Sequence, residues 1–181
     1  MKKIQMVDLK SQYAFIRNEV QASIEEVLDT TSYINGPAVK SFQEDLQEYL
    51  GVKHVIPCAN GTDALQIALM GLKLKPGDEV ITADFTFAAT VEVISLLQLK
   101  PVLVDVDSKT FNIDPALIEA AITPKTKAII PVHLFGQIAD MDAINSIAKK
   151  HNLYVVEDNA QGIGARYGSV NDIKTMTGTL G

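Results

Sequence analysis

The chain has 181 residues, of which 47% are apolar and 21% charged, and its formal net charge is −6. This length can bury a sizeable core, and the composition is that of a globular protein. The negative charge argues against a nucleic-acid backbone or an anionic membrane as the main partner, although helix ends can still bind a small anion. Cys58 is the only cysteine, which excludes an intramolecular disulfide framework and a thiolate metal cluster.

The N-terminal residues predict a cytoplasmic protein. Acidic and polar residues follow Met1 before any apolar stretch develops, unlike the start of a secretion signal. No run of residues approaches the roughly 18 apolar residues of a membrane span.

The first 50 residues predict an arm and a pair of helices. Apolar residues recur at helical spacing over residues 11–30, which predicts an amphipathic helix. Residues 32–37 (Ser-Tyr-Ile-Asn-Gly-Pro) interrupt the pattern, which resumes over residues 38–50. We expect residues 1–50 to pack against a second domain, residues 51–181.

Short apolar runs alternate with longer helical patterns in this second domain. The runs are rich in Val and Ile, which is typical of strands buried on both faces. They cover residues 54–58, 79–82, 101–106, 128–132 and 153–157. Helical patterns cover residues 62–73, 88–99, 115–121 and 142–151. The alternation predicts an α/β domain with a mostly parallel sheet flanked by helices.

Local signals mark two boundaries and one irregular region. Residues 75–78 (Lys-Pro-Gly-Asp) predict a turn ahead of a strand. Asp114 is the expected N-cap of a helix that has Pro115 at its first position. Residues 168–181 contain neither a strong strand nor a capped helix, from which we expect a chain cut within a larger fold.

In parallel α/β sheets, ligands bind beyond the carboxyl ends of the strands, and three turns there carry candidate residues. In the first, Gly61 allows a ligand to approach the backbone, and the free amides and dipole at the helix start favour an anion. The Thr62 hydroxyl adds a donor. A simple N-cap and turn without a ligand explains these residues equally well.

The second turn carries Phe85 and Phe87 after the strand that ends near residue 82. An aromatic ring just past a strand can stack on a planar ligand. On these residues alone, the favoured interpretation is that both rings merely cover the core.

The third turn places Asp158 directly after an apolar strand. Burying a carboxylate is costly unless a positive charge or several donors meet it. A protonated pyridine nitrogen would be such a partner, and the carboxylate would keep that ring protonated as an electron sink. Capping of the next turn, a Mg²⁺ ion or an ion pair with Arg166 are alternatives that the residues leave open.

Together these motifs resemble those of the DegT/DnrJ/EryC1/StrS family of nucleotide-sugar aminotransferases, which depend on pyridoxal 5'-phosphate (PLP). The resemblance runs through nearly the whole chain and is specific because its motifs keep their order and spacing. They are VDLK (7–10), INGP (34–37), NGTDAL (60–65), PGDEVI (76–81), TFAAT (86–90), PVHLFGQ (131–137) and EDNAQG (157–162). The resemblance implies the aspartate-aminotransferase (type I) fold, with residues 51–181 as a partial large domain, truncated before the C-terminal small domain.

The resemblance implies cofactor-binding roles for five residues. Gly61 and Thr62 would hold the PLP phosphate, and Phe87 would stack on the pyridine ring. Asp158 would pair with the ring nitrogen, and Gln161 would hydrogen-bond the phenolic oxygen. No metal site is implied.

Three other motif residues are expected to be structural. Asn60 and Asp63 flank the phosphate turn. His133 lies at an apolar strand end, where a packed, hydrogen-bonded histidine is the expected state rather than a substrate contact.

Members of the family carry their Schiff-base lysine beyond the aspartate, in a Ser-Phe-x-x-x-Lys motif that does not occur in these 181 residues. Lys174 lacks the preceding Ser-Phe and is interpreted as a surface lysine. The chain thus contains no predicted catalytic residue. The lysine holds PLP and moves the proton, so we expect the 181-residue chain to be inactive by itself while still able to bind PLP non-covalently.

The implied reaction is transfer of an amino group, commonly from glutamate, to a keto group of a nucleotide-linked sugar by a homodimer. The sequence of residues 60–65 (NGTDAL) favours a UDP-sugar. A PLP-dependent sugar dehydratase and a non-catalytic protein that binds PLP or a nucleotide sugar remain alternatives. A dinucleotide-binding domain is disfavoured, because no Gly-x-Gly-x-x-Gly follows the first predicted strand.

Overall fold

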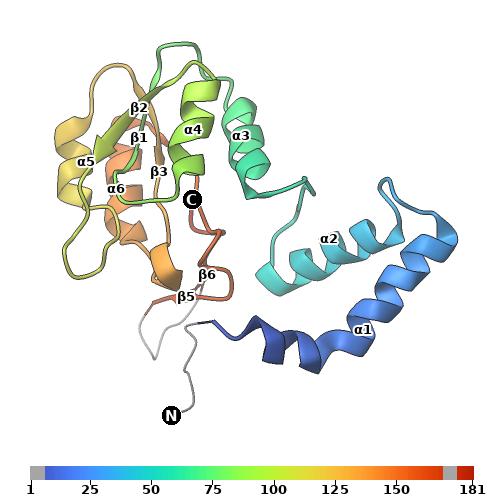
Figure 1. The fold of residues 1–181 in the computed structure, drawn as a ribbon. Coiled ribbons are helices and arrows are strands. Elements are labelled where there is room, and N and C mark those ends of the chain that lie inside the picture. The colour runs from blue at the N-terminus through green and yellow to red at the C-terminus, as the bar shows by residue number, and fades with distance from the viewer. Residues whose placement is uncertain (1–6, 169–174) are drawn as a thin grey trace. The chain divides into compact units, whose positions relative to one another are not determined.

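The computed structural model describes residues 7–168 and 175–181 (Figure 1). Lys174 therefore lies outside the described residues. The chain divides into two compact units, Met1–Pro57 and Cys58–Gly181. Within the described ranges, none of the helices combines the length and the apolar character that a membrane crossing requires.

The first unit contains the two helices expected from the sequence, α1 (Leu9–Thr30) and α2 (Pro37–Leu50). Asp8 caps α1 by accepting a hydrogen bond from the backbone N–H of Ser11 (3.1 Å). Pro37 occupies the first turn of α2, and Gly51 ends it in the left-handed conformation (φ 68°). Neither helix contains a buried residue.

The second unit is built on a four-stranded parallel sheet in the order β2-β1-β3-β4. Its strands are β1 (Glu79–Ala83), β2 (Lys100–Val104), β3 (Thr126–Ile130) and β4 (Tyr154–Val155). The predicted α/β class with a parallel sheet is confirmed, and four of the five apolar runs overlap its strands.

The fifth run, residues 54–58, is not a strand, so this part of the prediction is wrong. Ile56 is 74% exposed, and Pro57 has no N–H to donate to a sheet. Apolar composition favours a strand only where a neighbouring strand and packed side chains stabilise it, and within the described residues this segment has neither.

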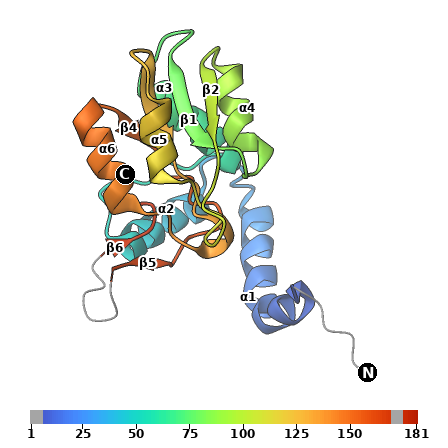
Figure 2. The ribbon, with the colours of Figure 1, turned by 90° about the vertical axis from the view of Figure 1, so that its left-hand side faces the viewer.

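Helices cover both faces of the sheet (Figure 1). They are α3 (Gly61–Gly71), α4 (Ala88–Leu96), α5 (Pro115–Ala121) and α6 (Met141–His151). Helices α3 and α4 lie on one face, whereas α5 and α6 lie on the other and face the viewer in Figure 2. As predicted, Asp114 caps α5 and accepts a hydrogen bond from the N–H of Ala116 (2.9 Å).

Alternation along the strands divides the core into two clusters. On one face, Val80 and Ala128 pack with Leu69 of α3 and Ile94 of α4. The side chains of the next strand residues, Ile81 and Ile129, lie on the other face. They pack with Ile118 of α5 and Ile144 of α6. Both sides of the central strands β1 and β3 are almost entirely buried, which explains why their apolar runs are nearly continuous, whereas the edge strands β2 and β4 are partly exposed.

The last described residues contain a short antiparallel pair that the sequence did not predict, β5 (Arg166–Tyr167) and β6 (Thr175–Met176). Strands of two residues leave no periodic signal in a sequence.

The topology places a crevice between β1 and β3. Helix α4, which follows β1, lies on one face, whereas α6, which follows β3, lies on the other. The chain segments beyond these two strands therefore separate at the carboxyl end of the sheet. Such a switch point is where open α/β sheets bind their ligands.

Candidate functional site

A cavity of about 220 Å³ lies at this switch point. It is lined by the start of α3 and by the segments that follow β1, β3 and β4. All five residues expected to bind the cofactor line it, namely Gly61, Thr62, Phe87, Asp158 and Gln161. The other lining residues belong to the motifs that carry the family resemblance but were assigned no role from the sequence; they are Leu65, Thr86, Ala89, Val132, Leu134 and Ala160.

The start of α3 lines part of the cavity. Asn60 caps the helix by accepting from the N–H of Asp63 (2.9 Å), and its amide donates to the Asp63 carboxylate (3.1 Å). These bonds support the structural roles expected for the two residues. A Cβ at Gly61 would meet no atom within 4 Å, so the space beside this glycine is open. The first-turn amides and the helix dipole can therefore meet an anion there.

Phe87 stands at the N-cap position of α4 and is 75% exposed. Phe85 instead contacts two other aromatic rings, with centroid distances of 6.0 Å to Phe111 and 6.5 Å to Phe135. The two phenylalanines of this turn are thus distinct. Phe87 lines the cavity and does not cover the core, so its ring is available to a planar ligand.

Asp158 contributes a carboxylate to the lining of the cavity, and only 7% of the residue is exposed. Its backbone extends the sheet beyond β4, because its N–H donates to the carbonyl of Pro131 (2.9 Å). Its Oδ2 accepts from the Thr90 hydroxyl (2.7 Å), and its Oδ1 accepts from the N–H of Ala160 (3.3 Å).

Two alternatives for Asp158 find no support in residues 7–168 and 175–181. No ion pair joins it to Arg166 there, and no cluster of His, Cys, Asp or Glu suits a metal ion. The capping alternative is present as the weak bond from Ala160. A buried carboxylate without a cationic neighbour is suited to a ligand that brings the positive charge.

Gln161 has a defined orientation. Its Oε1 accepts a hydrogen bond from the backbone N–H of Phe135 (2.7 Å), in the short 3₁₀ turn Leu134–Gly136. An N–H donor requires the amide oxygen on that side, which fixes the assignment of the two amide atoms. The Nε2 group is then the end of the side chain that can donate to a ligand oxygen.

His133 is fully buried, and both of its ring nitrogens are used. Nδ1 accepts from the N–H of Ala139 (3.2 Å), so the ring proton lies on Nε2, which donates to Glu157 (2.9 Å). The structure confirms the expectation of a packed, hydrogen-bonded histidine.

Glu157 also accepts hydrogen bonds from the backbone N–H groups of Gly178, Leu180 and Gly181. Burial acts to raise the pKa of its carboxyl, but the bonds from His133 and the three amides outweigh burial and hold that pKa below its usual range. Glu157 therefore ties the last described residues to the strand end that carries Asp158.

The sequence model of the DegT/DnrJ/EryC1/StrS aminotransferase family matches residues 14–181. The chain belongs to this family.

Individual family members share the fold and much of the sequence. The chain is 55% identical over 164 residues to a UDP-2-acetamido-2-deoxy-3-oxo-D-glucuronate aminotransferase of Pseudomonas aeruginosa, covering 91% of this chain and 46% of the relative. It is 47% identical over 175 residues to a UDP-N-acetyl-3-dehydro-alpha-D-glucosamine 3-aminotransferase of Acidithiobacillus ferrooxidans, covering 94% and 47%. The chain thus spans somewhat less than half the length of these relatives.

A crystal structure of NtdA from Bacillus subtilis with bound cofactor PMP superimposes with a TM-score of 0.86 at 39% identity. The match covers 91% of this chain and 38% of that one. The expected fold, that of the large domain of PLP aminotransferases, is therefore confirmed.

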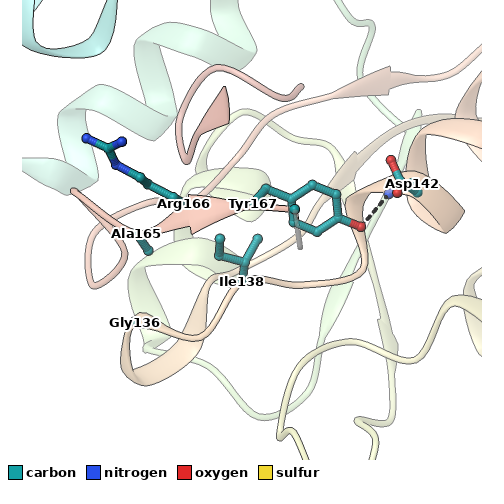
Figure 3. A pocket seen from close by; sticks show the side chains of 7 residues that line it. Gly136, Ile138, Asp142, Ala165, Arg166 and Tyr167 are labelled. Carbon is teal, nitrogen blue, oxygen red and sulfur yellow. Dashed lines mark hydrogen bonds between the residues drawn. The ribbon is translucent and has the colours of Figure 1, made fainter. Parts of the chain in front are cut away.

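The 181-residue chain has a second, larger cavity of about 590 Å³, which is lined by none of the five expected cofactor residues (Figure 3). Tyr167 lies across it and accepts a hydrogen bond from the N–H of Asp142 (3.2 Å), while the Arg166 side chain extends away from that ring. Burial raises the pKa of the Tyr167 hydroxyl. The smaller cavity is the better candidate, because it alone of the two combines a buried carboxylate with an open helix N-terminus.

Proposed function

We propose that the cavity at the switch point binds PLP and that the whole protein transfers an amino group to a keto group of a nucleotide-linked sugar. One observation carries the proposal. The open N-terminus of α3 and the buried carboxylate of Asp158 line the same cavity, so it offers a site for an anion and a site for a cation. PLP carries both charges, on its phosphate and on its protonated pyridine nitrogen.

Each of the five residues has a defined role in this proposal. The backbone amides of Gly61 and Thr62, together with the Thr62 hydroxyl, bind the phosphate. Phe87 lies against the ring, and the Nε2 group of Gln161 donates to the phenolic oxygen. Asp158 holds the proton on the ring nitrogen, and in that state bound PLP supplies an electron sink for the transfer of the amino group.

The size of the cavity supports a single-ring ligand. Cavities that enclose drug-sized ligands measure about 300–1,000 Å³, whereas this one measures about 220 Å³. The sugar and nucleotide of a substrate would therefore extend beyond it.

We further propose that the substrate is a UDP-linked 3-keto sugar, the donor glutamate, and the whole protein a homodimer. The names of the two relatives above support the substrate class, because both describe UDP-sugars oxidised at carbon 3. With the whole protein, formation of 2-oxoglutarate from glutamate beyond one equivalent per protein chain should depend on such a sugar. A protein that uses only dTDP- or GDP-linked sugars would contradict the substrate class.

The cofactor assignment is tested by titrating PLP against the purified chain and following the absorbance of the bound cofactor. Asp158→Ala should largely abolish retention of PLP, and Asp158→Asn should weaken it by about tenfold or more, because a hydrogen bond to a charged group contributes about 1.5–3 kcal/mol. Asp84→Asn removes an exposed carboxylate from a neighbouring loop and serves as the matched control. Equal PLP affinity in the Asp158→Asn and Asp84→Asn variants would refute the role of Asp158.

A further inference from the structure

Thr90 is a fully buried hydroxyl that contacts the proposed cofactor ligand Asp158. It lies in the first turn of α4, and its Oγ1 is 2.7 Å from Oδ2 of Asp158, 68 residues further along the chain. No sequence pattern connects the two residues.

The direction of this hydrogen bond follows from the chemistry of its partners. An ionised carboxylate can only accept, so the Thr90 hydroxyl donates its one proton to Asp158. The Thr90 oxygen is also 3.2 Å from the hydroxyl oxygen of Thr86. Because the Thr90 proton is already used, Thr86 must be the donor in this second bond. The three groups form a directed chain from Thr86, which lines the cavity, through Thr90 to Asp158.

The other helical serine and threonine hydroxyls for which the described residues show a hydrogen bond have partners within four residues. Ser95, Thr30 and Ser146 each donate to the backbone carbonyl four residues before them, and Ser11 and Ser41 donate to the nearby carboxylates of Asp8 and Asp45. Such bonds are local and satisfy the hydroxyl within its own helix. Thr90 instead donates to a carboxylate 68 residues away, beyond the end of β4.

We infer that Thr90 is a positioning residue, which fixes the Asp158 carboxylate opposite the pyridine nitrogen of bound PLP. This inference rests on the proposed function. The hydrogen bond from Thr90 holds Oδ2 of Asp158 in place before the ligand arrives, so less order is lost on binding. Thr86 strengthens the effect, since donating to the Thr90 oxygen polarises the Thr90 hydroxyl.

The experiment compares three variants with the unaltered chain. Thr90→Val keeps the shape of the side chain and removes the donor. Thr90→Ser keeps the donor, and Thr86→Val removes only the second hydroxyl. Each protein is titrated with PLP and with an analogue in which a C–H group replaces the ring nitrogen. Circular dichroism establishes that the variants are folded.

The expected pattern separates positioning from packing. Thr90→Val should weaken PLP binding about tenfold, the value for loss of one hydrogen bond to a charged group. The PLP affinity of Thr90→Ser should stay within about threefold of that of the unaltered chain. The affinity of Thr86→Val should lie between those of Thr90→Ser and Thr90→Val. The carbon analogue lacks the ring nitrogen that Asp158 recognises. Thr90→Val and the unaltered chain should therefore bind this analogue with affinities that agree within about threefold.

Each contrary result has a distinct meaning. Equal PLP affinity in Thr90→Val and the unaltered chain would overturn the inference alone, as would equal losses for PLP and the carbon analogue. If the unaltered chain bound no PLP, the proposed function would fail and this inference with it. Should Thr90→Val not fold, Thr90→Cys replaces it, since a thiol is a weaker donor, and a loss confined to PLP is again required.

Discussion

At the scale of single residues, the turn that carries Asp158 and Gln161 packs closely around Gly162. A Cβ at Gly162 would lie 2.5 Å from Oδ1 of Asn159 and 2.9 Å from Cβ of His133. Gly162 therefore allows the Asp158–Gln161 turn to approach the buried histidine. That Asn159 oxygen is buried and has no hydrogen-bond partner within the described residues.

We predict that Gly162→Ala lowers the free energy of unfolding by about 1–3 kcal/mol, the usual cost of forcing an extra carbon into a packed site. Gly71→Ala is the matched control, because a Cβ there would meet nothing within 4 Å and alanine favours the helix. Chemical denaturation measures both variants. If Gly162→Ala were as stable as Gly71→Ala, the close packing around this turn would be disproved.

Residue roles could be predicted from the sequence where the signal is local. The Asp114–Pro115 start of α5 depends on neighbours within four residues, and this predicted N-cap is observed. Asn60 was expected to be structural, and its role is that of the N-cap of α3. The part played by Thr90 could not be predicted, because its partner Asp158 is brought to it only by the folded sheet. The same holds for Gln161, whose orientation is set by the N–H of Phe135.

At the scale of elements, Glu157 joins the end of β4 to the residues at 178–181. Its folded-state pKa is lowered, so the ionised form stabilises the fold. This stabilisation is present above the ordinary value of 4.5 and is lost as the pH falls through the lowered folded-state pKa.

We predict that Glu157→Gln reduces stability at neutral pH and flattens the loss of stability below about pH 4.5, because glutamine has no proton to take up. Thermal unfolding at several pH values measures this difference. Glu92→Gln, at an exposed position on α4, should keep the pH dependence of the unaltered chain. An unchanged acid slope in Glu157→Gln would contradict the proposed role of the carboxylate.

Element types were largely predictable, because burial on both faces leaves a continuous apolar run and burial on one face leaves a helical period. Residues 54–58 have the composition of a strand but have no neighbouring strand in the described chain, and the sequence of one segment contains no information about its neighbours. The β5–β6 pair was not predicted because strands of two residues are too short to leave a sequence pattern.

At the scale of the whole molecule, the buried core lies in the unit Cys58–Gly181. Ile129 is fully buried between the helix layers, whereas Phe15 of α1 is 91% exposed. Two large apolar residues of the same chain thus have opposite environments.

We predict that Ile129→Ala destabilises the chain by about 2–5 kcal/mol. Phe15→Ala should change the free energy of unfolding by no more than about 0.5 kcal/mol, as is usual for exposed positions. Urea denaturation of the two variants provides the comparison. A large loss in Phe15→Ala would show that this ring is buried in solution and would contradict the exposed position described here.

A crystal structure of the chain with PLP added would show directly whether the switch-point cavity binds the cofactor. We predict density for one PLP in this cavity, with the phosphate at the amides of Gly61 and Thr62 and the ring nitrogen within hydrogen-bond distance of Asp158. Density for PLP beside Tyr167 in the larger cavity, or a phosphate directed at Asp158, would contradict it.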